Sequence, residues 1–190
     1  MSDENKFPEI VVFAGPNGSG KTTIKEGVVL NIPYVNADDI QRERNCTNLE
    51  AAELADELRG FYLEEGGDFA FETVLLTDRK LQFLQKAKER GYFIKCFYVL
   101  TSDPMINVSR VLSRVEAGGH DVPPDVVIRR YHSALALIPR LIDLCDIVHI
   151  YDNTTTLFRI YKKRKDKIFI WPNEFWDEHA IKTLVEQKTE

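Results

Sequence analysis

The chain has 190 residues, of which 44% are hydrophobic and 29% charged, as is ordinary for one soluble globular domain. Its net charge of −5 at pH 7 gives no general attraction to nucleic acids or to anionic membranes, so neither is expected as a partner. Three widely spaced cysteines, without a Cys-x-x-Cys pair, argue against a zinc site. A polar N-terminus and the lack of a long apolar stretch predict a cytoplasmic protein.

The first predicted strand, residues 9–14, leads into a glycine-rich loop. Residues 15–22 read Gly-Pro-Asn-Gly-Ser-Gly-Lys-Thr, which matches the phosphate-binding P-loop pattern G-x-x-x-x-G-K-S/T. A helix is predicted at 21–29, so strand, loop and helix follow in the order that this motif requires. The alternative is a glycine-rich turn without a ligand, which this context disfavours.

The loop residues have defined tasks in binding ATP. Glycines let consecutive backbone amides point inward around the phosphates, and the start of the helix adds its positive dipole end. Lys21 is expected to place its charge on the β- and γ-phosphates, and the Thr22 hydroxyl is a candidate Mg²⁺ ligand. The expected nucleotide contacts in the loop are Gly15, Pro16, Asn17, Gly18, Ser19, Gly20, Lys21, Thr22 and Thr23. We therefore expect ATP and Mg²⁺ as cofactors.

Two carboxylates follow the second predicted strand, residues 34–36. Asp38 and Asp39 come directly after it, and the carboxyl ends of parallel strands border the ligand crevice. One aspartate is expected to face the γ-phosphate as a general base, and the other to cap a helix that begins near Ile40. The alternative is that both only cap the helix.

The third predicted strand, residues 69–73, ends in Glu72 and Thr73 and lies between helices predicted at 49–65 and 78–90. A glutamate where an apolar strand emerges needs a partner or a ligand. Substrate hydroxyls and a water-mediated Mg²⁺ contact are two candidates, and a surface glutamate without a ligand is the third.

A basic helical lid is predicted at about 104–131, after the strand at 93–100. It consists of a helix at 104–117, a glycine hinge and the start of a helix at 124–144. Its arms carry Arg110, Arg114, Arg129 and Arg130. Such a lid could close over ATP and neutralise charge on the transferred phosphoryl group. The alternative is ordinary surface pairing with Glu116, Asp121 or Asp125.

The rest of the sequence, after residue 144, predicts a strand at 147–151, a hairpin formed by 157–163 and 167–171, and a helix at 174–187. Asp152-Asn153 is interpreted as a turn, with a role near the adenine as the alternative. The basic run 162–167 is interpreted as a solvated hairpin tip, because it contains no aromatic residues for base stacking. The whole pattern predicts a single α/β domain over 1–190, a P-loop NTPase three-layer sandwich with a C-terminal β-hairpin plus helix.

The motifs that are absent narrow the function. There is no N-K-x-D for guanine, and no apolar strand ends in the Asp-Glu pair of ATPases that activate water. A small phosphotransferase is therefore favoured. A kinase of a nucleoside, an antibiotic or another small hydroxyl compound and an ATP-binding regulatory protein with little transfer activity remain the alternatives.

Together the motifs resemble the zeta toxin family of P-loop kinases. The similar segments are A-G-P-N-G-S-G-K-T-T at 14–23, N-A-D-D-I at 36–40, F-E-T at 71–73, R-V-x-x-R-V-x-x-G-G-H-x-V-P at 110–123, I-R-R-Y at 128–131 and Y-D-N at 151–153. The resemblance implies the fold of small nucleotide kinases and phosphorylation of an amino-sugar hydroxyl of UDP-N-acetylglucosamine. It also implies a separate antitoxin protein as a partner.

By position, the resemblance implies that Lys21 is the P-loop lysine, Asp38 the base and Arg114 a lid arginine on the phosphates. The further candidates for ATP contact are Arg110 and Arg130, and those for acceptor contact are Asp39, Glu72, Thr73 and His120. His120 stands where the studied toxins have a second lid arginine. The polar and basic residues that follow the strand glutamate in those toxins are replaced by Val74-Leu75-Leu76.

Overall fold

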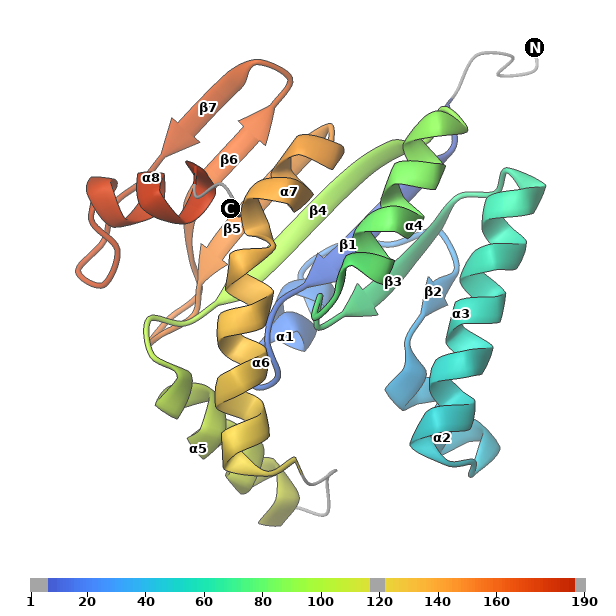
Figure 1. The fold of residues 1–190 in the computed structure, drawn as a ribbon, viewed down its shortest axis with the longest axis horizontal. Coiled ribbons are helices and arrows are strands. Elements are labelled where there is room, and N and C mark those ends of the chain that lie inside the picture. The colour runs from blue at the N-terminus through green and yellow to red at the C-terminus, as the bar shows by residue number, and fades with distance from the viewer. Residues whose placement is uncertain (1–6, 117–121, 187–190) are drawn as a thin grey trace.

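The structure, a computed structural model, describes residues 7–116 and 122–186. Its centre is a seven-stranded sheet in the order β2-β3-β1-β4-β5-β6-β7 (Figure 1). The strands are β1 (Glu9–Ala14), β2 (Tyr34–Val35), β3 (Phe69–Thr73), β4 (Phe93–Leu100), β5 (Ile147–Asp152), β6 (Phe158–Arg164) and β7 (Lys167–Ile170). The first five are parallel, and β6 and β7 add an antiparallel hairpin at one edge.

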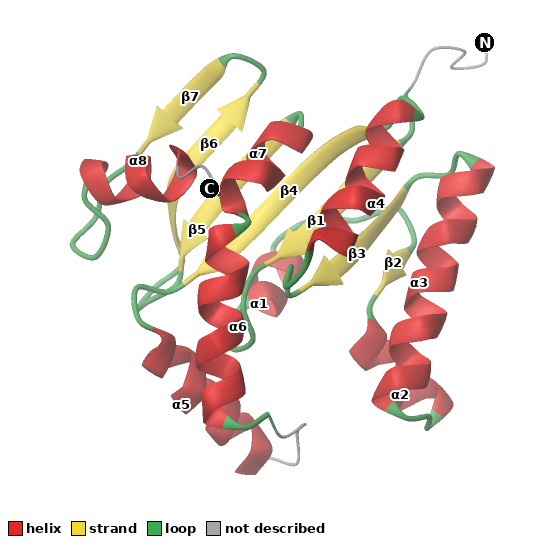
Figure 2. Ribbon diagram, viewed as in Figure 1, coloured by secondary structure: helices red, strands yellow, loops and turns green. Residues whose placement is uncertain are grey.

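Helices lie on both faces of the sheet. They are α1 (Lys21–Glu26), α2 (Ala37–Arg44), α3 (Asn48–Glu65), α4 (Asp78–Glu89), α5 (Pro104–Glu116), α6 (Pro124–Ala136), α7 (Ile138–Leu144) and α8 (Glu178–Glu186). Figure 2 shows α3, α4, α6, α7 and α8 on the face toward the viewer, and α1 behind the sheet. The predicted α/β sandwich with its C-terminal hairpin plus helix is confirmed.

Successive side chains of a strand point to opposite faces of the sheet, so the side chains of β1 contribute to two separate apolar clusters. Ile10 and Val12 belong to the large cluster on the side of α3, α4, α7 and α8, together with the free thiols Cys96 and Cys145. Val11 and Phe13 belong to a smaller cluster with Ile24 of α1. A strand buried on both faces fixes the start of the P-loop rigidly, because β1 lies between β3 and β4.

Several predicted helices differ from the structure, and the one predicted at 21–29 ends at Glu26 with Gly27 as its C-cap. The segment 124–144 forms two helices, α6 and α7, separated at Leu137, because Pro139 in the first turn of α7 cannot continue the hydrogen bonding of a preceding helix. The last helix begins at Glu178 and not at 174, because Oδ1 of Asn173 accepts hydrogen bonds from the amides of Phe175 and Trp176 and holds a turn there. No helix in the described part of the chain is long and apolar enough to cross a bilayer.

Candidate active site

Three glycines of the P-loop stand where no other residue fits. Gly15, Gly18 and Gly20 have φ angles of 142°, 75° and 97°, which L side chains rarely adopt. A Cβ on Gly15 would lie 2.1 Å from the Val99 carbonyl oxygen, and one on Gly20 would lie 2.2 Å from Nδ2 of Asn153. The loop therefore packs directly against β4 and the loop after β5, which leaves its amides in one fixed curve.

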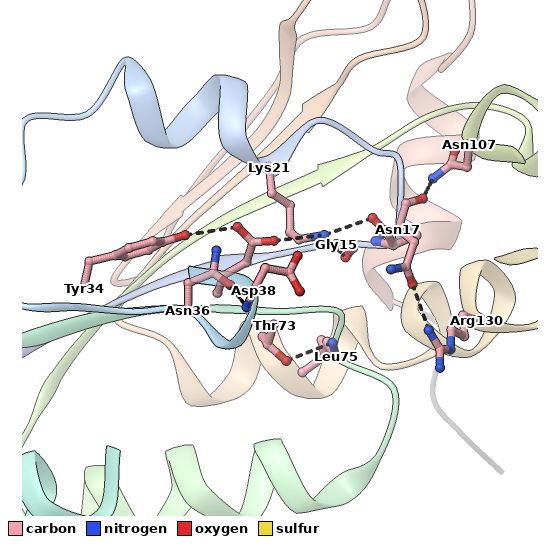
Figure 3. A network of polar contacts seen from close by, with 12 residues as sticks. Gly15, Asn17, Lys21, Tyr34, Asn36, Asp38, Thr73, Leu75, Asn107 and Arg130 are labelled. Carbon is pink, nitrogen blue, oxygen red and sulfur yellow. Dashed lines mark hydrogen bonds and ion pairs between the residues drawn. The ribbon is translucent and has the colours of Figure 1, made fainter. Parts of the chain in front are cut away.

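Lys21 is held inside this curve. Its Nζ donates to the carbonyl oxygens of Gly15 at 2.9 Å and Pro16 at 3.1 Å, and it lies 3.6 Å from Oε1 of Glu72 (Figure 3). Burial lowers the pKa of Lys21, and the negative charge of Glu72 opposes that shift. The lysine is thus a buried cation beside the loop, which is what contact with phosphate oxygens requires.

The hydroxyl groups that follow the lysine are accessible. Thr22 and Thr23 are exposed in the first turn of α1, whereas Oγ of Ser19 is buried and has no hydrogen-bond partner among the described residues. No group of three or more His, Cys, Asp or Glu side chains within residues 7–116 and 122–186 is arranged to hold a metal ion. Thr22 as a Mg²⁺ ligand stays a prediction, and phosphate oxygens would have to supply further ligands beside its hydroxyl.

The helix after β2 is capped by neither aspartate, which corrects the prediction. Asn36 is the cap: its Oδ1 accepts a hydrogen bond from the Asp38 amide at 2.9 Å, and α2 begins at Ala37, three residues earlier than expected. Asp39 pairs with Arg42 on the surface of α2. Because Asn36 serves the helix end, the exposed carboxylate of Asp38 is available for another role.

Asp38 and Glu72 come from adjacent strand ends and flank Lys21. The negative charges of Glu72 and Asp38 both oppose the lowering of the Lys21 pKa by burial, and Figure 3 shows Asp38 beside the lysine. Glu72 is not a free surface residue, because Oε2 also accepts a hydrogen bond from the Tyr34 hydroxyl at 3.0 Å. Burial and the charge of Glu72 raise the pKa of Tyr34, which keeps the phenol protonated as the donor.

Thr73 supports the turn that follows the glutamate. Its Oγ1 accepts a hydrogen bond from the amide of Leu75 at 3.0 Å (Figure 3). Leu75 has a φ of 55°, an unusual left-handed conformation for a branched side chain, and is fully buried. The threonine hydroxyl therefore fixes the chain between β3 and α4, while its role toward an acceptor stays a prediction.

Two asparagines hold the P-loop from the other half of the chain: Asn107, which the sequence did not single out, and Asn153, which was interpreted as part of a turn. Nδ2 of Asn107, a fully buried residue of α5, donates to the Asn17 carbonyl oxygen at 2.6 Å. Nδ2 of Asn153, after β5, donates to the Ser19 carbonyl oxygen at 2.8 Å. Arg110 fixes that second loop in turn, because its Nη2 donates to the Asn153 carbonyl oxygen at 2.8 Å.

The arginines of the predicted lid have different surroundings. Nη1 of Arg130 donates to Oδ1 of Asn17 in the P-loop at 3.5 Å, whereas Arg129 forms an exposed pair with Asp125 at 4.0 Å. Arg114 is exposed, and its positive charge adds to the larger effect of burial in lowering the pKa of Lys21. His120 lies outside the described residues. The structure thus brings Arg130 to the loop and leaves Arg129 as a surface residue, while a contact of Arg114 with phosphate stays a prediction.

Residues 31–174 match the family model described as zeta toxin. The chain belongs to the zeta toxin family. This match begins after the P-loop, so the assignment of the loop rests on its own sequence and geometry. An uncharacterised protein of Haemophilus influenzae is 26% identical over 127 residues, which are 64% of this chain and 91% of that protein.

Solved structures share the fold of nearly the whole chain. A structure from the PezAT chromosomal toxin-antitoxin system of Streptococcus pneumoniae is similar with a TM-score of 0.65 and 18% identity, and the match covers 98% of this chain and 81% of that one. A crystal structure of AvrRxo1-ORF1:-ORF2 with ATP is similar with a TM-score of 0.70 and 15% identity, over 96% of this chain and 64% of that one. At these identities the likeness establishes the fold alone.

Proposed function

We propose that this zeta toxin family member is an ATP- and Mg²⁺-dependent kinase. It transfers the γ-phosphoryl group to a hydroxyl of a small acceptor, a nucleotide sugar such as UDP-N-acetylglucosamine. One observation carries the proposal: Lys21, Asp38 and Glu72 gather at the carboxyl ends of three adjacent parallel strands, β1, β2 and β3. In such sheets that edge is where ligands bind. The related fold solved with ATP supports the choice of nucleotide.

In the proposed reaction, Asp38 accepts the proton of the acceptor hydroxyl. The hydroxyl oxygen then forms a bond to the γ-phosphorus, and the bond from that phosphorus to the β,γ-bridging oxygen breaks. The bridging oxygen keeps the electron pair and leaves as part of ADP. The exposed position of Asp38, free of the helix cap, gives its carboxylate access to an acceptor.

The other residues act on charge and position. Lys21, Arg114 and Arg130 would stabilise negative charge on the phosphoryl oxygens, since a water-poor site strengthens such contacts. Bound Mg²⁺, held through Thr22, would neutralise further charge on the phosphates. Glu72, fixed by Tyr34 and Lys21, is proposed to accept hydrogen bonds from the hydroxyl groups of the acceptor.

The test is transfer of labelled phosphate from ATP to UDP-N-acetylglucosamine by the wild type, Asp38→Ala and Asp39→Ala. We expect Asp38→Ala to bind ATP normally and to lose about 10² to 10⁴ in kcat, the usual contribution of a general base. Asp39→Ala is the matched control, because its carboxylate pairs with Arg42 on the surface, and it should retain most activity. Equal turnover by Asp38→Ala and the wild type would refute the assigned base.

A wild type that binds ATP but transfers no phosphate would instead refute UDP-N-acetylglucosamine as the acceptor, and a screen of other hydroxyl compounds would follow.

A separate antitoxin is the proposed protein partner, because one structural neighbour comes from a toxin-antitoxin system. The reaction is proposed to occur in the cytoplasm, where ATP and nucleotide sugars are present.

A further inference from the structure

One face of the sheet carries aromatic and basic residues in cross-strand rows. The strand register pairs Phe97 with His149, His149 with Lys162, and Lys162 with Phe169, so these four side chains share one face across β4 to β7. The same register makes a row of Lys95, Ile147, Arg164 and Lys167 on one side, and Val99, Tyr151 and Arg159 on the other. We call these rows, with Trp171, the open face.

No described helix covers the open face over β5, β6 and β7. Figure 1 shows α7 and α8 on the opposite side of these strands, and α1 is the one labelled helix behind the sheet, where it packs on β1 and β4. Ile24 of α1 accordingly joins the cluster of Val11, Phe13 and Val99. Over the hairpin, Arg164, Lys167 and Phe169 of the open face are exposed, whereas His149, Tyr151 and Lys162 are half-buried.

The charge of the open face is opposite to that of the whole protein. The three rows contain five basic residues and no carboxylate, while the chain has a net charge of −5. Of these five cations, Lys95 alone has a carboxylate partner among the described residues, Glu9 at 2.8 Å. Burial, with the charges of Lys162, Arg159 and Lys95, lowers the pKa of His149 to about 4. The imidazole is thus a neutral aromatic ring at physiological pH, with three cations around it.

The rings of the open face are aligned. The Phe97 and His149 rings lie 5.1 Å apart at an interplanar angle of 10°, and those of Phe169 and Trp171 lie 6.0 Å apart at 13°. The Arg159 guanidinium lies over the Trp171 ring, 4.5 Å from its centroid. Phe169 is 44% exposed, so its ring is accessible to a ligand on this face.

We propose that the open face binds single-stranded nucleic acid, with phosphates on Lys162, Arg164 and Lys167 and bases against Tyr151, Phe169 and Trp171. Aromatic rings flanked by cations on an uncovered sheet are the combination that such ligands require, since bases stack on rings and phosphates pair with cations. The basic run 162–167 contains no aromatic residue, but the register places Phe169 directly beside Lys162. This activity does not depend on phosphoryl transfer.

Charge favours this ligand over a second copy of the chain. Two open faces placed together would oppose ten cations without a carboxylate from the rows, which is unfavourable. An acidic protein would satisfy the cations but gives no reason for an aligned set of rings. Self-association and plain polyanion binding are therefore outcomes that the test must separate.

The test is fluorescence anisotropy with labelled oligonucleotides of about 12 nucleotides, oligo-U and oligo-dT, titrated with the full chain in about 50 to 200 mM salt. We expect saturable binding that weakens with salt, with a logarithmic slope near −2 for about three phosphates. Binding of either oligonucleotide supports the proposal, and a preference identifies RNA or DNA as the ligand.

Three variants separate the parts of the site. The double variant Lys162→Ala/Arg164→Ala should flatten the salt slope by about 1.4, since each phosphate contributes about 0.7. Phe169→Ala should weaken binding about tenfold and leave the slope unchanged. The control is Lys86→Ala/Lys182→Ala, which removes the same net charge from two exposed lysines of α4 and α8 on the opposite face and should bind like the wild type.

Several results would overturn the proposal, provided that thermal unfolding and ATP binding show each variant to be folded. These are no saturable binding at the lowest salt, equal losses in the control pair, or equal competition by inorganic polyphosphate of the same charge. Concentration-dependent self-association that Phe169→Ala abolishes, without oligonucleotide binding, would identify the open face as a contact between copies of the chain.

Discussion

The ammonium nitrogen of Lys21 lies 3.6 Å from Oε1 of Glu72, and the two side chains are 7% and 18% exposed. This pair joins the P-loop to strand β3, and the hydrogen bond from Tyr34 to the same carboxylate extends the link to β2. One small polar network therefore positions both Lys21, which would bind the nucleotide, and Glu72, which would bind the acceptor.

Glu72→Gln should move the alkaline limit of ATP binding to lower pH. Burial lowers the pKa of Lys21, and the negative charge of Glu72 partly restores it, so a neutral side chain leaves the lysine with a lower pKa. Because the protonated lysine binds phosphates, affinity is lost as pH rises through this pKa. ATP titrations between about pH 7 and 10 would measure the limit. Tyr34→Phe, which keeps the carboxylate, is the control, and an unshifted limit in Glu72→Gln would contradict this coupling.

Arg130 and Arg129 are adjacent in sequence, but their substitution by alanine should affect phosphoryl transfer differently. Arg130→Ala removes the contact with Asn17 and a cation at the P-loop, so kcat/KM for phosphoryl transfer should fall about 10- to 100-fold. Arg129→Ala removes only an exposed pair with Asp125 and should stay within about twofold. Steady-state kinetics of both variants decides the matter, and equal losses would count against a specific role for Arg130.

Alanine at Gly20 and at Gly60 should have opposite effects on stability. Gly20→Ala requires a left-handed alanine whose Cβ would overlap Nδ2 of Asn153, so it should cost at least about 1–2 kcal/mol and weaken ATP binding. Gly60 lies within α3, where a Cβ added to it would meet no atom within 4 Å, and Gly60→Ala should stabilise the protein by about 0.5–1 kcal/mol. Urea unfolding of both variants tests this pair, and a neutral Gly20→Ala would show that the loop can move.

Asn107→Asp should lower both stability and ATP affinity. The substitution keeps the shape of the buried side chain but removes the donor to the Asn17 carbonyl oxygen and introduces a charge there. A loss of about 1–3 kcal/mol is expected, since a buried group left unpaired keeps its desolvation cost. Asn31→Asp is the matched exposed control, expected within about 0.5 kcal/mol. Calorimetric ATP titration with urea unfolding would measure both effects, and wild-type values for Asn107→Asp would rule out the clamp.

The sequence predicted those strands and loops whose patterns lie within a few neighbouring residues. The run before Gly15 is apolar at every position from Ile10 to Ala14, and β1 is accordingly buried on both faces. Glycines at fixed spacing predicted a P-loop, and each of Gly15, Gly18 and Gly20 has a positive φ. Local signals fail where two nearby residues compete: Asp38 and Asn36 can both cap a helix, and the asparagine does so because the helix begins about one turn earlier than expected.

The residues that could not be found from the sequence act over long distances. Asn107 stands four positions before the buried Val111 of α5, so helical periodicity marks it as a polar residue on an apolar face. That signal predicts burial but not the partner, Asn17, which lies 90 positions away. The same is true of the open face, where Lys162 and Phe169 become neighbours only through the register of the hairpin.

The bond from Asn153 to Ser19 spans 134 positions of the chain, and that from Asn107 to Asn17 spans 90. During synthesis on the ribosome, the whole P-loop consensus therefore emerges long before the residues that fix its shape. A growing chain carries the motif for most of its synthesis without the two amide clamps, and it gains the second only once β5 has been made. A truncation before Asn153 would keep every letter of the consensus and lose the clamp on Ser19.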